Sequence, residues 1–576
     1  MAHSSPTDAS TIAANLSDFD YIVNPGPKAA VTGLKAAVST DNAIVTETML
    51  RVLREGGNAV DAGVAGCLVQ AAVEPFMTNY TGTVTFLYYE AKTGRYHQLD
   101  SSGFMPSGLA PFKPVPPQPT GYAAMPPSAC IPGFMPGLKA IHERFATRPW
   151  AELCADAIRW AEDGHPVSSF EYYVNTWGAD FTTFFPEGRA FYRPDGHFTP
   201  VGHRFRPPGM AETLRHVAEH GPDHMITGDW AKAFVAKAND MGWKITLEHM
   251  TETAPRWLEP LRFQHRDHEI VSLNVPQQQG AYIALVLGVL RELDLRSVAP
   301  QSADHYYYLA HALRLAQIHS GFITDTTVAD AAVDVIASPE HHKHLARLIK
   351  GLKPKVDLTE HARMVGGPGM VGGLSLYGGL GKPTRGRSDT KQPTGSCELS
   401  IVDAEGNWVQ MMNTLQSGGI PGMVVEGVPM VGTHATFGGL TSAIDGRLFK
   451  GARLRQCIGN TFVLKDGKPV YSLGSPGNVH CTVPQVLAYL LEFGYAPSEA
   501  VAAPRILPMG EDSSLVLEDR LSDETIDGLA ALGLNVKVSE AWDFHMGSFA
   551  MCYRDEKGLI GAIADPRRCA VADGLR

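Results

Sequence analysis

The stretch GSCELSIVDAEGNWVQMMNTL, residues 395–415, decides how this chain is expected to fold. Its apolar runs on either side of AEG predict a β-hairpin. The preceding residues, 365–395, are loaded with Gly, Pro and Ser and show no periodicity, which is typical of a flexible connector. Ser396 therefore stands where a connector meets the first strand of a hairpin.

A hydroxyl at such a junction suggests a chemical role. Hydroxyl and thiol groups are poor nucleophiles until a base removes their proton. If the chain is cleaved just before the nucleophile, the freed α-amine, with a pKa of about 7.7–8.0, can act as that base. Gly395 before the bond, Ser396 after it and a strand to hold it meet these needs. The alternative interpretation is a linker that simply ends at a strand, since Gly-Ser pairs are common.

The rest of the chain alternates helical and strand patterns. Residues 43–55 have helical apolar spacing that ends at Gly56-Gly57, and a second helix is expected over 58–73. A hairpin with the turn AKTG follows, and helical segments dominate from 137 to 353. Beyond residue 396, two more hairpins are expected, NTFVLKDGKPVYSLGS and SFAMCYRDEKGLIGAIAD, with the helices VPQVLAYLLEFG and SDETIDGLAALG. Strand pairs that face helical layers predict a layered α/β sandwich.

The composition and net charge of the chain exclude some classes of function. The 576 residues are 44% hydrophobic and 19% charged, with a formal net charge of −11, so no basic surface for nucleic acid is expected. The first residues resemble no signal peptide, and no run of about 18 apolar residues predicts a membrane span. The eight cysteines are scattered without a CxxC pair, which favours reduced thiols and a cytoplasmic protein.

Several short motifs follow one another along the chain. They are GGNAVDA (56–62), VEP (73–75), LYYEAKTGRYHQLD (87–100), IPGFMPGLKAIHERFATRPWAEL (131–153), AIRWAEDGHPV (157–167), AETLRHVAEHGPD (211–223), IVDAEGN (401–407), LGSPGN (473–478), EAVAAPR (499–505) and ADPRR (564–568). In this order and spacing they resemble the gamma-glutamyltranspeptidase family, from about residue 33 to residue 570.

The resemblance implies a four-layer αββα fold of the N-terminal-nucleophile hydrolase type, with extra helices in the N-terminal part. It also implies a precursor that cleaves itself. The family's nucleophile, usually Thr, precedes the Asp of its VVDxxGN motif by seven residues, and counting back from Asp403 reaches Ser396. A one-residue slip would select Cys397 and a two-residue slip Thr394. The expected parts are an N-terminal arm (1–33), a large subunit (34–395) and a small subunit (396–576).

The resemblance implies two further catalytic roles. Thr414 falls where the family has a second Thr that supports the nucleophile, although a strand Thr with no special role is the alternative. Gly477 and Asn478 fall on the family's Gly-Gly pair, whose backbone N–H groups stabilise the oxyanion. Backbone donors need little from the side chain, so Asn478 is compatible with that role.

The substrate-binding positions depart from the family. Ser102 replaces the Arg that holds the substrate's α-carboxylate, and Gln416 replaces an Asn that holds its amino group. Gln456 and Cys457 stand in place of a Ser-Ser pair, and Thr436 lies near the position of a missing Asp. A zwitterionic head group needs paired charges once it is desolvated. The expected substrate is therefore not an ordinary gamma-glutamyl compound.

Less polar residues occupy the neighbouring positions. A neutral or apolar acyl group would suit a pocket built from them, while core packing is the alternative interpretation for each. Arg453 and Arg455 are candidates for a carboxylate or for structural ion pairs, and Glu398 either lies near the nucleophile or faces solvent. The apolar candidates are Met77, Tyr80, Phe104, Met411 and Met430.

We therefore expect an amidohydrolase or acyltransferase that forms an ester on Ser396 and acts on a small amide. A carbon–carbon bond hydrolase of a biosynthetic pathway and a non-catalytic binding homologue are the alternatives. No cofactor is expected, since no nucleotide-binding motif occurs. No metal site is expected either, because the histidines of 265–268 and 341–344 lack the HExxH pattern and are interpreted as exposed. The expected assembly is a heterodimer of self-cleaved subunits, with further pairing of such units allowed.

Overall fold

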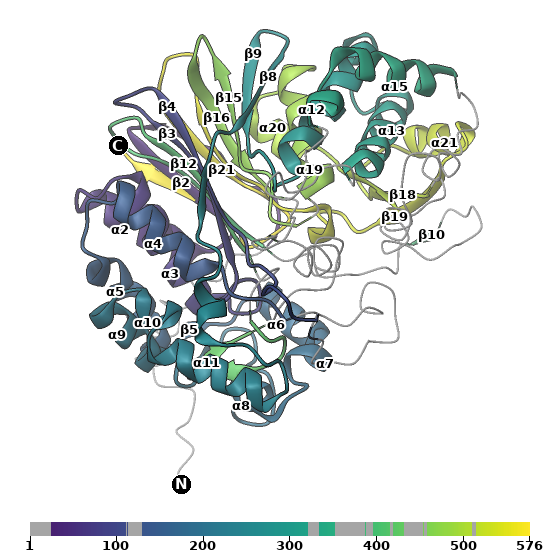
Figure 1. Ribbon diagram of the computed structural model, residues 1–576. Coiled ribbons are helices and arrows are strands. Elements are labelled where there is room, and N and C mark those ends of the chain that lie inside the picture. The colour runs from purple at the N-terminus through teal and green to yellow at the C-terminus, as the bar shows by residue number, and fades with distance from the viewer. Residues whose placement is uncertain are drawn as a thin grey trace, which may run out of the picture.

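Two large β-sheets stacked face to face form the centre of the computed structural model (Figure 1). Helices α2 and α3 cover the outer face of one sheet, and α12 and α19 cover the outer face of the other. This arrangement confirms the expected four-layer αββα sandwich. The structure describes residues 25–110, 112, 129–320, 333–351, 386–387, 396–414, 419–430, 453, 458–477, 479–509 and 514–576.

The first sheet contains the hairpin that follows Ser396. Strands β11 and β12 pair antiparallel at its centre, and β2 and β3 flank them. Both strands therefore have neighbours on each side, and neither lies at a sheet edge. In sheet order the strands are β22 (Val571–Leu575), β2 (Ala36–Thr40), β11 (Cys397–Val402), β12 (Trp408–Thr414), β3 (Thr83–Glu90), β4 (Arg95–Ser101) and β7 (Arg256–Leu258).

The second sheet contains the two other predicted hairpins, β15–β16 and β20–β21. In sheet order its strands are β1 (Val31–Leu34), β21 (Ile560–Ala564), β20 (Ala550–Arg554), β16 (Lys468–Gly474), β15 (Thr461–Lys465), β9 (His268–Ser272) and β8 (Leu261–His265). A smaller sheet lies beside α13 and α21 and contains β10 (Gly386–Arg387), β19 (Asn535–Ser539), β18 (Ser514–Glu518) and β17 (Ile506–Met509).

Strict alternation along β11 and β12 explains why the chain folds into layers. Leu399 and Ile401 pack into the core shared with α2 and α3, together with Val409 and Met411 of β12. The residues between them point to the other sheet, because successive side chains of a strand face opposite sides. One hairpin thus supplies an apolar face to the helices and a second face to the sandwich interior.

The helix pair α2 (Ala43–Arg54) and α3 (Ala59–Val73) begins and ends where the sequence predicts. The Asn42 side chain caps α2 by accepting from the N–H of Ile44. The Asn58 side chain forms a capping box with Asp61, which satisfies the free N–H groups at the start of α3. The residues of α3 are all buried, so this helix lies between the sheet and the outer helices.

The N-terminal part adds a body of helices below the sandwich (Figure 1). These helices are α4 (Phe134–Phe145), α5 (Trp150–Asp163), α6 (Ser169–Trp177), α7 (Ala179–Thr182), α8 (Pro186–Tyr192), α9 (Met210–His220), α10 (Asp223–Ile226) and α11 (Asp229–Asp240), with the short strands β5 (His165–Pro166) and β6 (Arg204–Phe205). On the opposite side lie α12 (Gln279–Glu292), α13 (Ala303–Ser320), α14 (Val333–Ile336), α15 (Pro339–Gly351), α19 (Val479–Leu491), α20 (Pro497–Ala502) and α21 (Asp523–Ala531).

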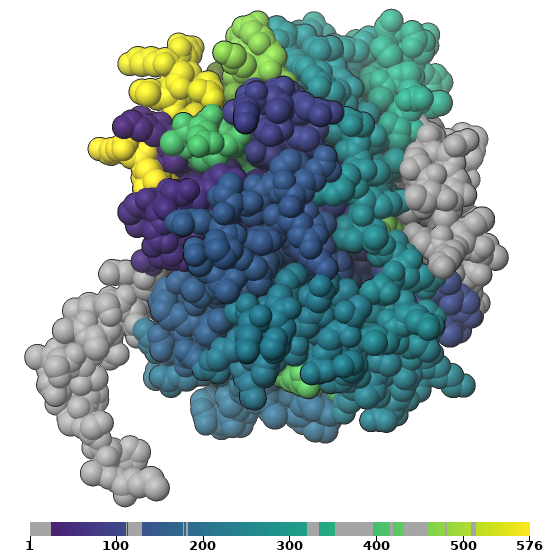
Figure 2. Space-filling model, turned by 60° about the vertical axis from the view of Figure 1, so that its left-hand side comes forward, coloured from purple at the N-terminus to yellow at the C-terminus, as the bar shows by residue number. Residues whose placement is uncertain are grey.

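A small hairpin from the C-terminal part packs into the helical body. Strands β13 (Val424–Val425) and β14 (Val428–Pro429) lie beside α8 and α11, and Figure 2 shows their green atoms among the teal helices. The indole of Trp230 donates to the carbonyl oxygen of Val425 at 3.1 Å, and Thr213 donates to that of Glu426. The two expected subunits are thus interlocked away from the sheets as well as within them.

A polar network lies between the two sheets, close to the start of β11. Gln410 and Asn460 each donate to Oε1 of Glu398, at 2.6 and 2.9 Å. Burial raises the pKa of Glu398 well above its usual value. A Cβ at position 474 would lie 2.1 Å from Glu398 Oε1, so Gly474 leaves the room that this carboxyl needs. The alternative that Glu398 faces solvent is wrong, because its side chain is fully buried.

Candidate active site

Ser396 lies directly before β11, and only 6% of its surface is exposed. Its hydroxyl donates to Oγ1 of Thr414 at 2.9 Å. Thr414 is the last residue of β12, which pairs with β11, so the hairpin itself brings the two hydroxyls together. A Cβ at position 82 would lie 2.1 Å from the Thr414 carbonyl oxygen, so Gly82 is needed for the chain to pass this end of the sheet.

Charged groups support the backbone around Ser396. Arg568, which is almost fully buried, donates from Nη1 to the Ser396 carbonyl oxygen at 3.1 Å. The neighbouring thiol, Cys397, donates to Oε2 of Glu74 at 3.4 Å, and Gln70 donates to the same oxygen at 2.9 Å. Burial, followed by the charge of Glu74, raises the pKa of Cys397 well above its usual value. Since the thiolate is the nucleophilic form of cysteine, this environment makes Cys397 a poor nucleophile.

A second buried carboxyl, Asp41, completes this cluster. Its Oδ1 accepts from the Ser548 hydroxyl at 2.7 Å, and its Oδ2 accepts from the Glu398 N–H at 3.4 Å. Burial raises the pKa of Asp41 to about 7; the charge of Arg568 lowers it and that of Glu74 raises it. Asp41 therefore changes its charge near neutral pH, at the residue that follows β2 and beside the start of β11.

This shifted pKa predicts a pH-dependent stability. Between about pH 4 and pH 7 the unfolded chain releases the Asp41 proton while the folded chain keeps it, so the free energy of unfolding falls as pH rises. The loss through this one group is at most about 4 kcal/mol at 1.36 kcal/mol per pKa unit. Urea denaturation of Asp41→Asn should show a flatter profile than wild type over this range. Asp195→Asn, at an exposed position, is the control and should follow wild type; equal slopes in all three proteins would contradict the assignment.

Gly477, one of the two expected oxyanion residues, packs against the loop that contains Gly547 and Ser548, and Ser548 contacts Asp41. It has a φ of 73°, and its carbonyl oxygen accepts from the Ser475 hydroxyl at 3.2 Å. A Cβ on Gly547 would lie 2.5 Å from the same carbonyl, and the next residue, Ser548, holds Asp41. The loop after β16 thus packs tightly on Gly547-Ser548, and Ser548 holds the Asp41 carboxyl beside the start of β11.

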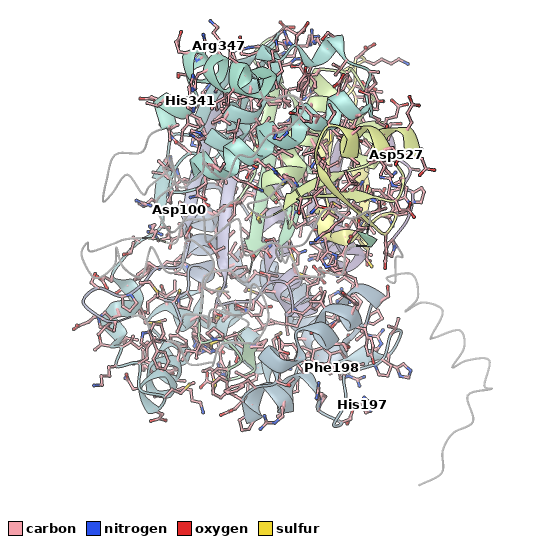
Figure 3. The ribbon with its side chains drawn as sticks, turned by 90° about the vertical axis from the view of Figure 1, so that its right-hand side faces the viewer. Asp100, His197, Phe198, His341, Arg347 and Asp527 are labelled. Carbon is pink, nitrogen blue, oxygen red and sulfur yellow. The ribbon has the colours of Figure 1, made fainter. Side chains whose placement is uncertain are left out.

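The hydroxyl of Ser102 is part of a buried polar network, where Asp100 and Gln277 are its hydrogen-bond partners. It donates to Oδ1 of Asp100 at 2.6 Å, and Gln277 donates to both residues. Arg453 lies 3.6 Å from the Asp100 carboxylate and also donates to the Ser102 carbonyl oxygen at 3.3 Å, while Arg256 lies 3.3 Å from Asp100. Figure 3 shows Asp100 at mid-height in the molecule, between the upper and lower groups of helices. Of the two interpretations of Arg453, the structural ion pair is the one that the geometry supports.

The apolar candidates are buried in the core. The hydroxyl of Tyr80 donates to the carbonyl oxygen of Leu68 in α3 at 2.8 Å, and its ring packs edge-on against Phe134. Met411 faces α3, where its sulfur would be 2.6 Å from a Cβ on Gly63. Met77 differs from these, because it packs in the small cluster that includes Cys397 and Cys569. Of the apolar candidates, Met77 is therefore the one placed beside the residue that follows Ser396.

Other predicted positions lie outside the described residues. They are Thr394, Gln416, Thr436, Arg455, Gln456, Cys457 and Asn478, and the connector 365–395 is described only at 386–387. The expectation that the histidines of 265–268 and 341–344 are exposed is partly wrong. His265 is buried against Glu492 at 2.6 Å, and His342 is buried with its Nε2 2.8 Å from the Ile336 carbonyl oxygen.

Three members of the site were missed from sequence. Glu74 and Arg568 stand inside the motifs VEP and ADPRR, so the signal was present without an assigned role. Asp41 had no signal beyond its position one residue before the helix cap Asn42. They meet because β2, β11 and β22 are neighbours in one sheet, with Arg568 placed just before β22 and Glu74 at the end of α3.

The layered αββα fold is the one expected of hydrolases of the N-terminal-nucleophile class. The chain belongs to the gamma-glutamyltranspeptidase family, whose model matches residues 45–575. A glutathione hydrolase proenzyme of Pseudomonas aeruginosa is 26% identical over 92% of this chain and 93% of its own length. The acylase ACY 1 proenzyme of a Pseudomonas species (strain V22) is 25% identical, covering 95% and 96%.

A solved structure is similar in fold. The cephalosporin acylase from Bacillus halodurans superposes with a TM-score of 0.77 at 20% identity, over 96% of this chain and 98% of its own. The protein is thus a gamma-glutamyltransferase-like enzyme, with the amidohydrolase or acyltransferase activity of its family. Among the described helices, none is both long and apolar enough to span a membrane.

Proposed function

We propose that this enzyme matures by cleavage of the Gly395–Ser396 bond and then hydrolyses small amides through an ester on Ser396. The observation that carries the proposal is the 2.9 Å hydrogen bond between the hydroxyls of Ser396 and Thr414 at the end of a central, buried hairpin. Thr414 fixes the direction of the Ser396 hydroxyl, and Arg568 holds the carbonyl of the same residue. A nucleophile held on both sides loses little entropy on reaching its reactive geometry.

The reaction follows from the groups present. The freed α-amine of Ser396 takes the hydroxyl proton as Oγ attacks the amide carbon, and backbone N–H groups at Gly477 and Asn478 stabilise the oxyanion. The carbon–nitrogen bond then breaks, and the amine leaves with the proton that the α-amine returns. Water, activated by the same α-amine, hydrolyses the ester and releases the acid. An amine acceptor in place of water gives acyl transfer.

The acyl group is proposed to be neutral or apolar. Arg453, a possible carboxylate ligand, already faces Asp100, and the Ser102 hydroxyl is engaged by Asp100 and Gln277. Recruiting either group for a substrate carboxylate would break buried hydrogen bonds, which is costly. Met77 is buried in the apolar cluster that includes Cys397, next to Ser396 in the chain. The similarity to an acylase, ACY 1, is consistent with an acyl group other than gamma-glutamyl.

The cleaved parts are proposed to remain together as a heterodimer. After cleavage, residues 396–576 would still supply β11 and β12 to a sheet that also contains β2 and β3 of the other part. The hairpin β13–β14 would remain packed against α8 and α11. Separation would therefore unpair central strands and expose core residues, which opposes dissociation.

Two measurements test the proposal: the site of chain cleavage and the substrate preference of the mature enzyme. N-terminal sequencing of the purified protein should find a fragment of about 180 residues that begins at Ser396. The enzyme should then release amine faster from N-acyl amides with apolar acyl groups than from gamma-glutamyl anilides. A fragment that starts at Thr394 or Cys397 would move the nucleophile. A preference for the gamma-glutamyl substrate would refute the proposed acyl group while leaving the nucleophile unaffected.

A further inference from the structure

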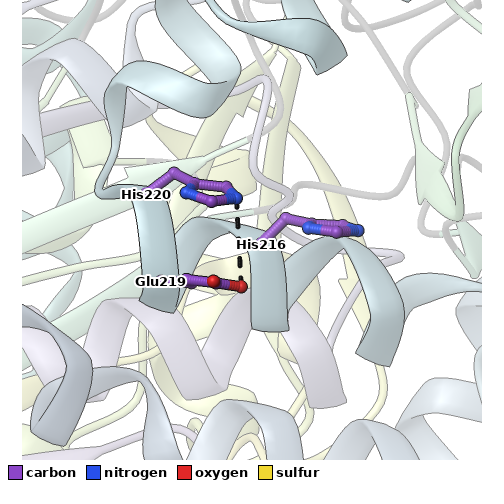
Figure 4. A group of neighbouring side chains, drawn as sticks. All are labelled: His216, Glu219 and His220. Carbon is purple, nitrogen blue, oxygen red and sulfur yellow. Dashed lines mark ion pairs between the residues drawn. The ribbon is translucent and has the colours of Figure 1, made fainter.

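A group of metal-binding side chains lies on α9, in the helical body. His216, Glu219 and His220 stand at positions i, i+3 and i+4, which places them on one face of the helix. One ligand atom from each can be chosen so that the three lie within 4.8 Å of one another, and all three side chains are exposed. Figure 4 shows them projecting from the same side of α9, with the Glu219 carboxylate 3.9 Å from Nε2 of His220.

A third imidazole packs against this face. The ring of His224, from α10, lies 5.4 Å from that of His216 and 6.2 Å from that of His220. His224 is more than nine-tenths buried, and its Nε2 has no hydrogen-bond partner among the described residues. A buried ring nitrogen without a partner is costly in a folded protein.

The surrounding charges favour a cation. His220 is the last residue of α9, so the cluster lies at the helix C-terminus, where the negative end of the helix dipole stabilises positive charge. Asp229 and Glu426 lie within electrostatic reach of the imidazoles, from α11 and the β13–β14 hairpin respectively. Three separate elements therefore surround one histidine face with carboxylates.

We propose that His216, Glu219 and His220 bind one divalent transition-metal ion of the Zn²⁺ type, with water completing the coordination. Imidazole nitrogens and a carboxylate oxygen are ligands that suit Zn²⁺, and the spacing lets one helical turn supply all three. The site is on the surface and apart from the buried Ser396, so the ion has a structural role. It ties the last turn of α9 together beside α10 and the β13–β14 hairpin.

The test measures metal binding by the full chain. After treatment with a chelator and buffer exchange, titration calorimetry with Zn²⁺ should show one saturable site per chain. Even substitutions outside the coordination shell weaken metal affinity by about 10- to 100-fold, so His216→Ala and His220→Ala should each weaken binding by at least about tenfold. Binding of Co²⁺ should give a visible absorption band that the double variant lacks.

The controls separate a built site from general histidine binding. His197→Ala removes an exposed histidine that lies outside α9, near the lower edge of Figure 3, and should leave Zn²⁺ binding unchanged. Circular dichroism without metal should be the same for all variants, because the substituted side chains are exposed. Unaltered stoichiometric binding in the His216→Ala/His220→Ala double variant, or no saturable binding by wild type, would overturn the proposal.

Discussion

Ser396→Ala should yield a single full-length chain with no detectable amidase activity. Without the hydroxyl, nothing at this position can attack the Gly395 carbonyl during maturation or the substrate carbonyl afterwards. Loss of a hydroxyl nucleophile lowers kcat on the order of 10⁶-fold in hydrolases that use one. The fold should persist, because the change removes one buried hydroxyl whose partner Thr414 is itself a hydroxyl. Denaturing gels, intact mass and amine release would measure the effect.

Two matched variants test whether the loss of cleavage and activity in Ser396→Ala identifies the nucleophile. Ser396→Thr keeps the hydroxyl and should still produce the fragment, at a changed rate. Cys397→Ala removes a thiol that is buried against Glu74 and should leave cleavage at the same bond. If Cys397→Ala abolished chain cleavage and amidase activity and Ser396→Ala did not, Cys397 would be the nucleophile and the proposal for Ser396 would be wrong.

Glu518→Gln should cause the largest loss of stability that we expect from a single side chain. Glu518 accepts from Nε and Nη2 of Arg567, at 2.6 and 2.7 Å, and from Arg520 at 2.8 Å. Burial alone would raise the pKa of Glu518, yet the guanidinium of Arg567 holds it below its usual value. Both side chains of the Arg567–Glu518 pair are fully buried, so the substitution leaves two buried guanidinium groups, of Arg505 and Arg567, to share the single carboxylate of Asp565. The expected cost is about 3–5 kcal/mol.

Urea denaturation at pH 7 would measure this loss against an exposed ion pair. Arg262 and Glu269 form a similar two-bond contact at 2.8 and 2.9 Å, but the Arg262 side chain is 48% exposed. Glu269→Gln should therefore cost no more than about 1 kcal/mol. Equal destabilisation by the two substitutions would show that burial does not set the importance of the Glu518 network.

Local patterns predicted the main helices and hairpins, and the family resemblance selected Ser396 as the candidate nucleophile. The caps Asn42 and Asn58, the Gly56-Gly57 stop and the period-two alternation in 397–414 act over a few residues, so they can be read directly. The pairing of Ser396 with Thr414 also follows from one hairpin. These features depend on neighbours in the sequence, and physical rules for neighbours are strong.

The roles of Ser102, Tyr80 and Glu398 depended on contacts that no local rule contains. Each residue was compatible with a site or with a structural position. Ser102 accepts a hydrogen bond from Gln277, Tyr80 donates one to the Leu68 carbonyl in α3, and Glu398 accepts one from Asn460, directly before β15. A polar side chain satisfies its hydrogen-bonding capacity with whatever group the fold brings near, and distance along the chain does not limit that choice.

The sequence therefore predicted the hairpin and its helical cover, and its resemblance to a family added Ser396 as the candidate nucleophile at the start of β11. Only the tertiary structure decided the environment of that hydroxyl, where Asp41, Glu74 and Arg568 meet from parts of the chain separated by up to several hundred residues. Alternation along a strand tells which face a side chain occupies, but the order of strands in the sheet decides its neighbours. That order is set by the packing of the whole sandwich, which joins β2, β11 and β22 side by side.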